Sequence, residues 1–359
     1  MIRKNLKRLF CVLISLILFS LILPAVPARA DDDLTIDGFV FDAETLSDST
    51  IGVLFVRGTP SEGGELLYGN FDPAENTWRE IPVTNGEDTV TAKEAAFSLS
   101  GDIAHIAYTS VDGKIGYLYQ TDDGWSDAIF IESNNCNNKT GSLSDPDITI
   151  GGDGGIYICY FDTQGAEDEY YARSDAMLAS LKDGSFTKSV VINATGWFSS
   201  PDGNRTDAYA PIKIAPTSGG ATAVVRSSFW EKWYNGNDTA YYANFCKSAG
   251  EVSRFDGNYT VFAAAGNGSA VYALVHKSGA YHVISYNGTS NSVMESALAE
   301  FGAYAAGLTL DGTNIYYAAA KDSSLLFYLA GEAVSKDSIE NPILSSHNKL
   351  AAVLSDSIL

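Results

Sequence analysis

Short apolar stretches that alternate with polar residues recur along the chain, and turn residues separate them. The stretch Ala95–Ser133 is the clearest example, because Ser-Gly-Asp, Asp-Gly and Asp-Gly turns divide it into four such segments. Alternation with a period of two, bounded by turns of this kind, is typical of β-hairpins. The stretch therefore predicts a four-stranded antiparallel meander.

Further units with this pattern follow one another along the chain. The predicted units cover residues 38–83, 95–131, 147–193, 211–255, 259–297 and 303–335. A lone meander leaves free edges and an uncovered face, whereas radial stacking of such sheets buries both faces. A β-sandwich has fewer than the roughly 24 strands of these units, and the rungs of a β-helix are shorter. The sequence therefore predicts an all-β fold, a β-propeller of four-stranded antiparallel blades, with six blades plus a partial seventh.

The two ends of the chain carry separate signals. Residues 1–30 combine a basic start, an apolar run and the small-residue site Ala28-Arg29-Ala30. This pattern predicts a cleaved secretory signal peptide, with an uncleaved N-terminal anchor as the alternative. Residues 31–359 are predicted to form a single propeller domain. Within it, Ser346–Leu359 begins another apolar strand, which either closes the ring beside the first blade or starts a blade whose remainder is missing.

Charge narrows the range of partners. The chain has a formal net charge of −21, and residues 1–30 hold five of its 23 Lys and Arg residues and none of its 44 Asp and Glu residues. Residues 31–359 therefore carry 18 basic and 44 acidic side chains, a net charge of −26. Such a charge argues against nucleic acid and anionic membranes as partners, and it suits an exported protein. We expect a secreted or cell-surface monomer with no membrane span after signal cleavage.

Two of the units share a longer sequence motif, or phrase. It begins with an apolar strand that starts at a Gly and ends at a Tyr, and further tyrosines follow. In one unit a Gly-Trp hairpin comes after them. The phrase is carried by Gly101–Tyr108, Tyr117–Tyr119 and Thr121–Trp125, and again by Gly155–Tyr160 and Tyr170-Tyr171. The phrase resembles a blade of the BNR/Asp-box, sialidase-like β-propeller superfamily, whose Asp-box reads Ser/Thr-x-Asp-x-Gly-x-x-Trp. The box at Thr121–Trp125 is contracted, and the one near Lys182–Phe186 is poorer. The resemblance therefore implies the fold and does not by itself imply an activity.

Four connections are longer than a hairpin turn needs: Ser133–Pro146, Asp162–Asp168, Ala194–Ala210 and Ser228–Asp238. In a meander blade all four lie on one face. Together with Arg226, which follows a second strand, they supply the candidate ligand-binding residues Trp197, Arg205, Asp207, Tyr209, Arg226, Trp230, Trp233 and Tyr234. Aromatic rings beside carboxylates and arginines suit sugar rings and their hydroxyl groups. The alternative is that these rings fill gaps between blades.

Catalysis is the second function class. The resemblance implies an arginine triad, a Tyr–Glu pair and an Asp acid/base, but the Arg-Ile-Pro sequence typical of the family is absent. Arg57 and Arg226 could face a central pocket, with surface or inter-blade ion pairs as the alternative. A glycosidase needs two carboxylates about 5–10 Å apart, and Asp147, Asp162 and Asp207 are the first candidates. The sequence favours an exported, non-catalytic module that binds glycans or a cell-surface partner, with a sialidase-like glycoside hydrolase or lyase as the alternative.

Metal and cysteine signals are sparse. Asp145-Pro146-Asp147 and Gly151–Gly154 could bind Ca²⁺, although turn chemistry also explains them, and no other cofactor is expected. Cys159 lies within a predicted strand and is expected to be a buried thiol. A Cys136–Cys246 disulfide is left open.

Overall fold

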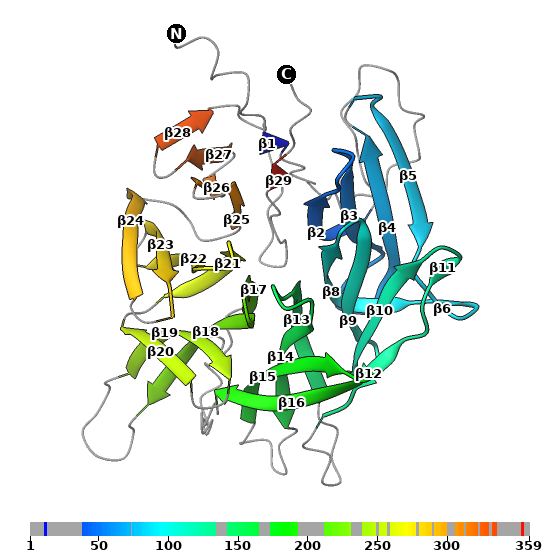
Figure 1. Cartoon of the computed structure of the whole chain (residues 1–359), viewed down its shortest axis with the longest axis horizontal. Coiled ribbons are helices and arrows are strands. Elements are labelled where there is room, and N and C mark those ends of the chain that lie inside the picture. The colour runs from blue at the N-terminus through cyan, green and yellow to red at the C-terminus, as the bar shows by residue number, and fades with distance from the viewer. Residues whose placement is uncertain are drawn as a thin grey trace.

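Four-stranded antiparallel sheets stand around a common centre in the computed structural model (Figure 1). The structure describes residues 11–12, 38–72, 74–133, 142–164, 173–192, 212–230, 239–248, 251–256, 259–277, 280–288, 291–299, 306–311, 314–321, 324–329, 332–335 and 353–354. Within these ranges the chain forms strands and turns and no helix, so no helix there could cross a membrane. This radial arrangement of meander sheets is that of a β-propeller. The all-β prediction is confirmed.

The first two predicted units join in one nine-stranded sheet. Its strands are β2 (Phe39–Thr45), β3 (Ile51–Arg57), β4 (Gly64–Asp72), β5 (Thr77–Pro82), β8 (Thr91–Ser100), β9 (Ile103–Ser110), β10 (Ile115–Thr121), β11 (Gly124–Trp125) and β12 (Ile129–Ile131). The two halves are linked where Thr91 and Ala92, at the start of β8, pair with the start of β4. A small hairpin of β6 (Thr84–Asn85) and β7 (Asp88–Thr89) lies between them in sequence.

Each of the other four predicted units forms its own four-stranded sheet, in the strand order of the sequence. The third contains β13 (Ser142–Ile150), β14 (Ile156–Gln164), β15 (Arg173–Lys182) and β16 (Ser185–Ile192). The fourth contains β17 (Lys213–Thr217), β18 (Gly220–Trp230), β19 (Thr239–Ser248) and β20 (Glu251–Asp256). The fifth contains β21 (Thr260–Gly266), β22 (Val271–Lys277), β23 (Ala280–Tyr286) and β24 (Asn291–Ala299). The sixth contains β25 (Ala306–Asp311), β26 (Asn314–Lys321), β27 (Ser324–Leu329) and β28 (Glu332–Ser335).

A short antiparallel pair lies between the sixth sheet and the first (Figure 1). It consists of β1 (Cys11–Val12) and β29 (Val353–Leu354), and β29 contacts both β2 and β25. β1 belongs to the segment for which the sequence predicts a signal peptide. β29 belongs to the predicted extra strand, and its two described residues are hydrogen-bonded to β1.

One strand differs clearly from the pattern in the sequence. The third strand of the third unit is expected at Glu169–Ser174, whereas β15 runs from Arg173 to Lys182 through residues whose composition tolerates a helix. β15 is hydrogen-bonded to β14 on one side and to β16 on the other. Pairing along both edges outweighs the weak local preference of the stretch. Asp183 and Gly184, both with positive φ, then make the tight turn into β16.

The core consists of apolar layers between neighbouring sheets. The six residues Ile51–Val56 of β3 are all buried, as expected for the most apolar strand of a unit. Cys159 is a free, fully buried thiol within one such layer, and this prediction is confirmed. Cys246 is also a free, buried thiol, so the disulfide left open by the sequence is not formed. Its other candidate member, Cys136, lies outside the described residues.

Candidate functional site

In three consecutive units an acidic residue follows a register shift in the first strand. This first strand is the one nearest the centre of the ring (Figure 1), and we call it the innermost strand. The register shifts between Val40 and Asp42 in β2, and again just before Glu94 in β8 and Asp147 in β13. A bulge adds an unpaired residue and re-aims the side chains beside it. Asp42, Glu94 and Asp147 therefore occupy equivalent places near the centre of the ring, where β2, β8 and β13 lie next to one another (Figure 1).

The carboxylates of β2 accept hydrogen bonds from the next innermost strand. The Phe97 N–H donates to Asp42 Oδ2 at 3.4 Å, and the Leu99 N–H donates to Glu44 Oε2 at 3.1 Å. β8 pairs with β4 only at Thr91 and Ala92, so beyond these residues alternate backbone N–H groups on its central side lack a ladder partner. The two side chains satisfy these groups and link the first blade to the second.

The same arrangement continues around the ring. The Asp145 N–H donates to Glu94 Oε2 at 2.6 Å, which links β8 to β13. The Ile214 N–H donates to Asp147 Oδ2 at 3.0 Å, which links β13 to β17. Four carboxylates thus connect four consecutive innermost strands through side chain to backbone hydrogen bonds.

One basic side chain joins this acidic series. Lys213 Nζ lies 3.8 Å from Asp147 Oδ2, and both side chains are only 14% exposed. Burial lowers the pKa of Lys213, but the charges of Asp147 and then Asp42, with smaller contributions from Cys159 and Asp145, outweigh it and raise that pKa overall. Lys213 is therefore a protonated, largely buried cation. We call Asp42, Glu44, Glu94, Asp145, Asp147 and Lys213 the axial group.

Glu44 has the most unusual protonation in the axial group. Removal from water, then the neighbouring Asp42 charge and, less strongly, Asp147, raise the pKa of Glu44 to about 8, although the Leu99 N–H favours its charged form. At neutral pH Glu44 is thus mostly the neutral acid. The axial group combines a neutral carboxyl, Glu44, with an ion-paired carboxylate, Asp147, and such a contrast suits a proton donor and a base.

The two candidate Ca²⁺ stretches, Asp145–Asp147 and Gly151–Gly154, lie within β13 and directly after it. No group of three or more His, Cys, Asp and Glu side chains that could hold a metal ion occurs among the described residues, which include Asp145 and Asp147. The glycine-rich stretch that follows β13 is a hydrogen-bonded turn, in which the Gly151 N–H donates to the Gly155 carbonyl at 2.8 Å.

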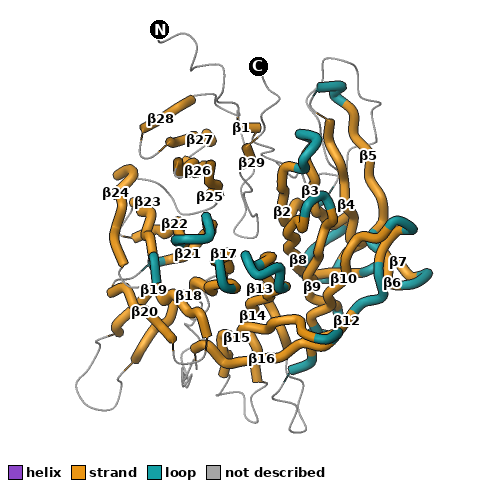
Figure 2. Tube along the Cα trace, viewed as in Figure 1, coloured by secondary structure: helices purple, strands orange, loops and turns teal. Residues whose placement is uncertain are grey.

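A pocket of about 500 Å³ lies away from the predicted loop face. It is formed by the turns between first and second strands and between third and fourth strands of the fourth and fifth sheets, with Tyr157 from the third. The long connections of the sequence prediction join second to third strands or one sheet to the next, at the other end of each sheet. The turns that follow β13, β17 and β21 lie near the centre of the ring (Figure 2). The pocket therefore lies at the opposite end of the sheets from the strand ends that these connections join.

The structure describes two of the eight candidate ligand-binding residues. Arg226 pairs with Ala243 inside β18, four residues before the end of that strand. Trp230 is the last residue of β18 and pairs with Thr239. It therefore belongs to a strand, whereas the sequence pattern predicts it in a loop. The second strand runs on through Phe229, because its ladder with β19 extends to this point. The other six candidates, Trp197, Arg205, Asp207, Tyr209, Trp233 and Tyr234, lie outside the described residues.

The structure places the candidate catalytic residues in different surroundings. Asp147 belongs to the axial group, whereas Asp162 is 1% exposed, receives a 2.5 Å hydrogen bond from Ser133 Oγ and lies opposite the buried Asp175 in the β14–β15 ladder. Arg57 forms exposed ion pairs with Glu65 and Glu80, which is the alternative that the sequence left open. Sequence reasoning missed Glu44 and Lys213, and the signal available was a charged residue in the first strand of a unit, Glu44 in FVFDAET and Lys213 in KIAPT.

Comparisons with known proteins give distant likenesses only. No family model and no curated protein sequence matches the chain. An α-L-arabinanase of Penicillium chrysogenum, complexed with arabinobiose, shares 11% identity with a TM-score of 0.49, over 84% of this chain and 94% of that chain. An α-L-arabinofuranosidase of Fusarium graminearum shares 12% identity with a TM-score of 0.45, over 79% and 88%. The β-propeller domain of the trilobed protease from Pyrococcus furiosus shares 11% identity with a TM-score of 0.36, over 85% and 97%. Likenesses of this degree assign neither a family nor an activity to the chain.

Proposed function

We propose that this protein is a carbohydrate-active β-propeller, a glycoside hydrolase or lyase of the sialidase-like class, with the axial group as its reacting centre. The observation that carries the proposal is the contrast between Glu44, a neutral carboxyl, and Asp147, a carboxylate paired with Lys213. Glycosidases depend on two carboxyl groups with different protonation states.

The roles of the two groups follow from their chemistry. The Glu44 O–H gives its proton to the glycosidic oxygen while the bond from that oxygen to the anomeric carbon breaks. The Asp147 carboxylate takes a proton from the water whose oxygen bonds to the anomeric carbon. Lys213 balances the charge of Asp147 and orients it. Because the pKa of Glu44 is about 8, we expect activity to fall above that pH.

The test is turnover on a panel of aryl glycosides, arabinan, sialosides and uronate polysaccharides, scored for hydrolysis and for the unsaturated ends that a lyase leaves. We expect turnover with at least one of them, and a loss of about 10²-fold or more in kcat for Glu44→Gln and Asp147→Asn. Glu80→Gln, which changes an exposed carboxylate, is the matched control. Turnover that survives Glu44→Gln would refute the assignment.

A second candidate function is an exported, non-catalytic module that binds glycans or a cell-surface partner. The observation in its favour is that Asp42, Glu44, Glu94 and Asp147 each accept a backbone N–H from a neighbouring strand, which gives each a structural role. Under this alternative the long-loop face holds the ligand. Glycan binding without turnover on any of these substrates would support it.

We also propose that the mature ring comprises six blades plus a partial seventh, because β29, which signal cleavage leaves in place, contacts both β25 of the sixth sheet and β2 of the first. Export through the N-terminal segment, and a monomeric state, complete the proposal. Mass spectrometry of the mature N-terminus tests the cleavage, since an N-terminus at Asp31 is expected.

A further inference from the structure

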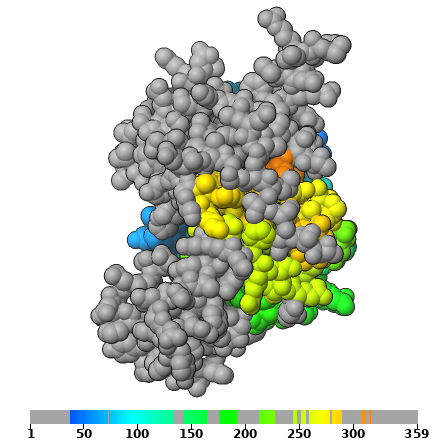
Figure 3. Space-filling view, turned by 90° about the vertical axis from the view of Figure 1, so that its left-hand side faces the viewer, coloured from blue at the N-terminus to red at the C-terminus, as the bar shows by residue number. Residues whose placement is uncertain are grey.

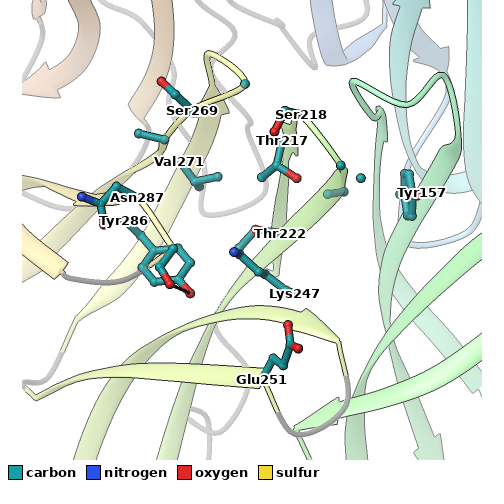
Figure 4. A pocket seen from close by; sticks show the side chains of 16 residues that line it. Tyr157, Thr217, Ser218, Thr222, Lys247, Glu251, Ser269, Val271, Tyr286 and Asn287 are labelled. Atoms are coloured by element: carbon teal, nitrogen blue, oxygen red, sulfur yellow. Dashed lines mark hydrogen bonds between the residues drawn. The ribbon is translucent and has the colours of Figure 1, made fainter.

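The pocket opposite the loop face is built from two neighbouring sheets. The turn 217–220 of the fourth sheet and the turn 268–270 of the fifth form part of its wall, and Lys247, Glu251 and Tyr286 come from outer strands of the same two sheets (Figure 4). Described residues of these sheets lie next to one another at the surface in Figure 3. At about 500 Å³ the pocket falls in the size range of small-molecule sites.

Two opposite charges line this pocket without neutralising each other. Lys247 Nζ lies 5.6 Å from the centre of the Tyr286 ring, which positions the ammonium over an aromatic face. Within the described part of the chain, neither Lys247 nor Glu251 has an ion-pair partner within 4.0 Å. The ammonium offers hydrogen-bond donors and the carboxylate offers acceptors, with no net charge between them.

The remaining residues that line the pocket are mostly polar or small, and they leave room for a ligand to approach the backbone of the turn closely. Thr222 is fully buried, and its Oγ1 has no hydrogen-bond partner among the described residues. A buried hydroxyl without a partner is rare and invites one. Gly219 lines the pocket, and a Cβ built there would meet no atom within 4 Å, so the turn leaves open space beside it. The Tyr157 ring, whose hydroxyl donates to Asp153 Oδ2 at 2.6 Å, lies beside Gly220 of the same turn and forms part of this wall.

We propose that this pocket binds a single uncharged sugar residue, independently of the axial group. Sugar hydroxyls both donate and accept, and so they match an ammonium, a carboxylate, a hydroxyl and tyrosine rings in one cavity. An anionic ligand would meet the Glu251 carboxylate and the strongly acidic chain. A cationic ligand would meet the Lys247 ammonium. The site would anchor a glycan on the face opposite the long loops.

The experiment is calorimetric titration of the full chain with a panel of neutral hexoses and pentoses, with glycine and sulfate as the zwitterionic and anionic probes. We expect a neutral sugar to bind, and Lys247→Ala and Glu251→Gln each to weaken it about tenfold or more. Gly219→Trp should abolish binding by filling the open space, while the thermal midpoint stays close to that of the parent. Lys277→Ala is the matched control, because Lys277 lies over the Tyr259 ring, 4.7 Å from its centre, and does not line the pocket.

Binding that persists in Gly219→Trp, a preference for glycine or sulfate, or no binding of any neutral sugar would each overturn the proposal. The axial variant Glu44→Gln separates this proposal from the proposed activity. It should lose turnover and still bind the sugar, whereas Gly219→Trp should lose the sugar and keep turnover on small aryl glycosides.

Discussion

The ion pair between Asp147 and Lys213 gives the sharpest test of how the axial group stabilises the fold. Asp147→Ala removes the partner of a cation that is only 14% exposed and also the acceptor of the Ile214 N–H. Breaking a buried pair by removing one partner costs about 3–5 kcal/mol, and an unsatisfied buried N–H costs about 1–3 kcal/mol. Asp42 and Asp145 still attract Lys213 in the variant and offset part of this loss. We therefore expect a loss of about 3–5 kcal/mol in total.

Three companion variants separate the contributions. Asp147→Asn keeps an oxygen that can accept the Ile214 N–H, so it should lose about 1–3 kcal/mol less than Asp147→Ala. The double variant Asp147→Asn with Lys213→Met removes both charges and should recover most of the stability, because a buried pair is often replaceable by uncharged groups. Glu80→Ala breaks an exposed pair with Arg57, at 2.5 Å, and should cost less than about 1 kcal/mol.

Urea unfolding and thermal melts measure these differences, and Asp147→Ala should melt about 4–7 °C lower than the parent. Urea is preferred to guanidinium because it leaves the ion pairs unscreened. If Asp147→Ala is as stable as Glu80→Ala, the reasoning about a buried and obligatory pair is refuted. If the double variant is less stable than Asp147→Asn alone, the cation has a favourable role that the pair does not explain.

Three further predictions concern separate parts of the molecule. The raised pKa of Glu44 means that the folded state binds its proton more tightly than the unfolded state, so the parent loses stability as pH rises from 4.5 to about 8. Glu44→Gln cannot ionise, so its stability should match that of the parent near pH 4 and exceed it by roughly 1–3 kcal/mol at pH 8. Thermal melts at both pH values measure this difference. Gly116→Ala would place a Cβ 2.3 Å from the Tyr108 ring and should cost about 1–3 kcal/mol in urea unfolding, whereas Gly219→Ala should be neutral. Trp233→Ala should weaken glycan binding at the loop face with little change in melting temperature, and a fall of many degrees would contradict a binding role.

Local pattern determined most of the strand inventory. Period-two alternation and Asp-Gly or Ser-Gly turns are properties of a few consecutive residues, so the hairpins of Ala95–Ser133 could be marked from the sequence. The turn glycines Gly101 and Gly113 adopt positive φ, as such turns require. Errors arose where pairing with distant strands decided the outcome. β15 begins later and runs further than its local composition indicates, and β18 continues to Trp230 because β19 pairs with it that far.

The functional geometry was decided by tertiary structure alone. Asp42, Glu94, Asp147 and Lys213 lie roughly 50–70 residues apart, and radial stacking of the blades brings their strands together at one centre. Each carboxylate follows a register shift, which depends on how two strands align and not on either strand alone. The sugar pocket likewise needs turns from two sheets and outer strands from both. A single sequence shows which side chains can donate or accept a proton. The position of each side chain in the folded protein, and the groups that it contacts, depend on the neighbouring blade.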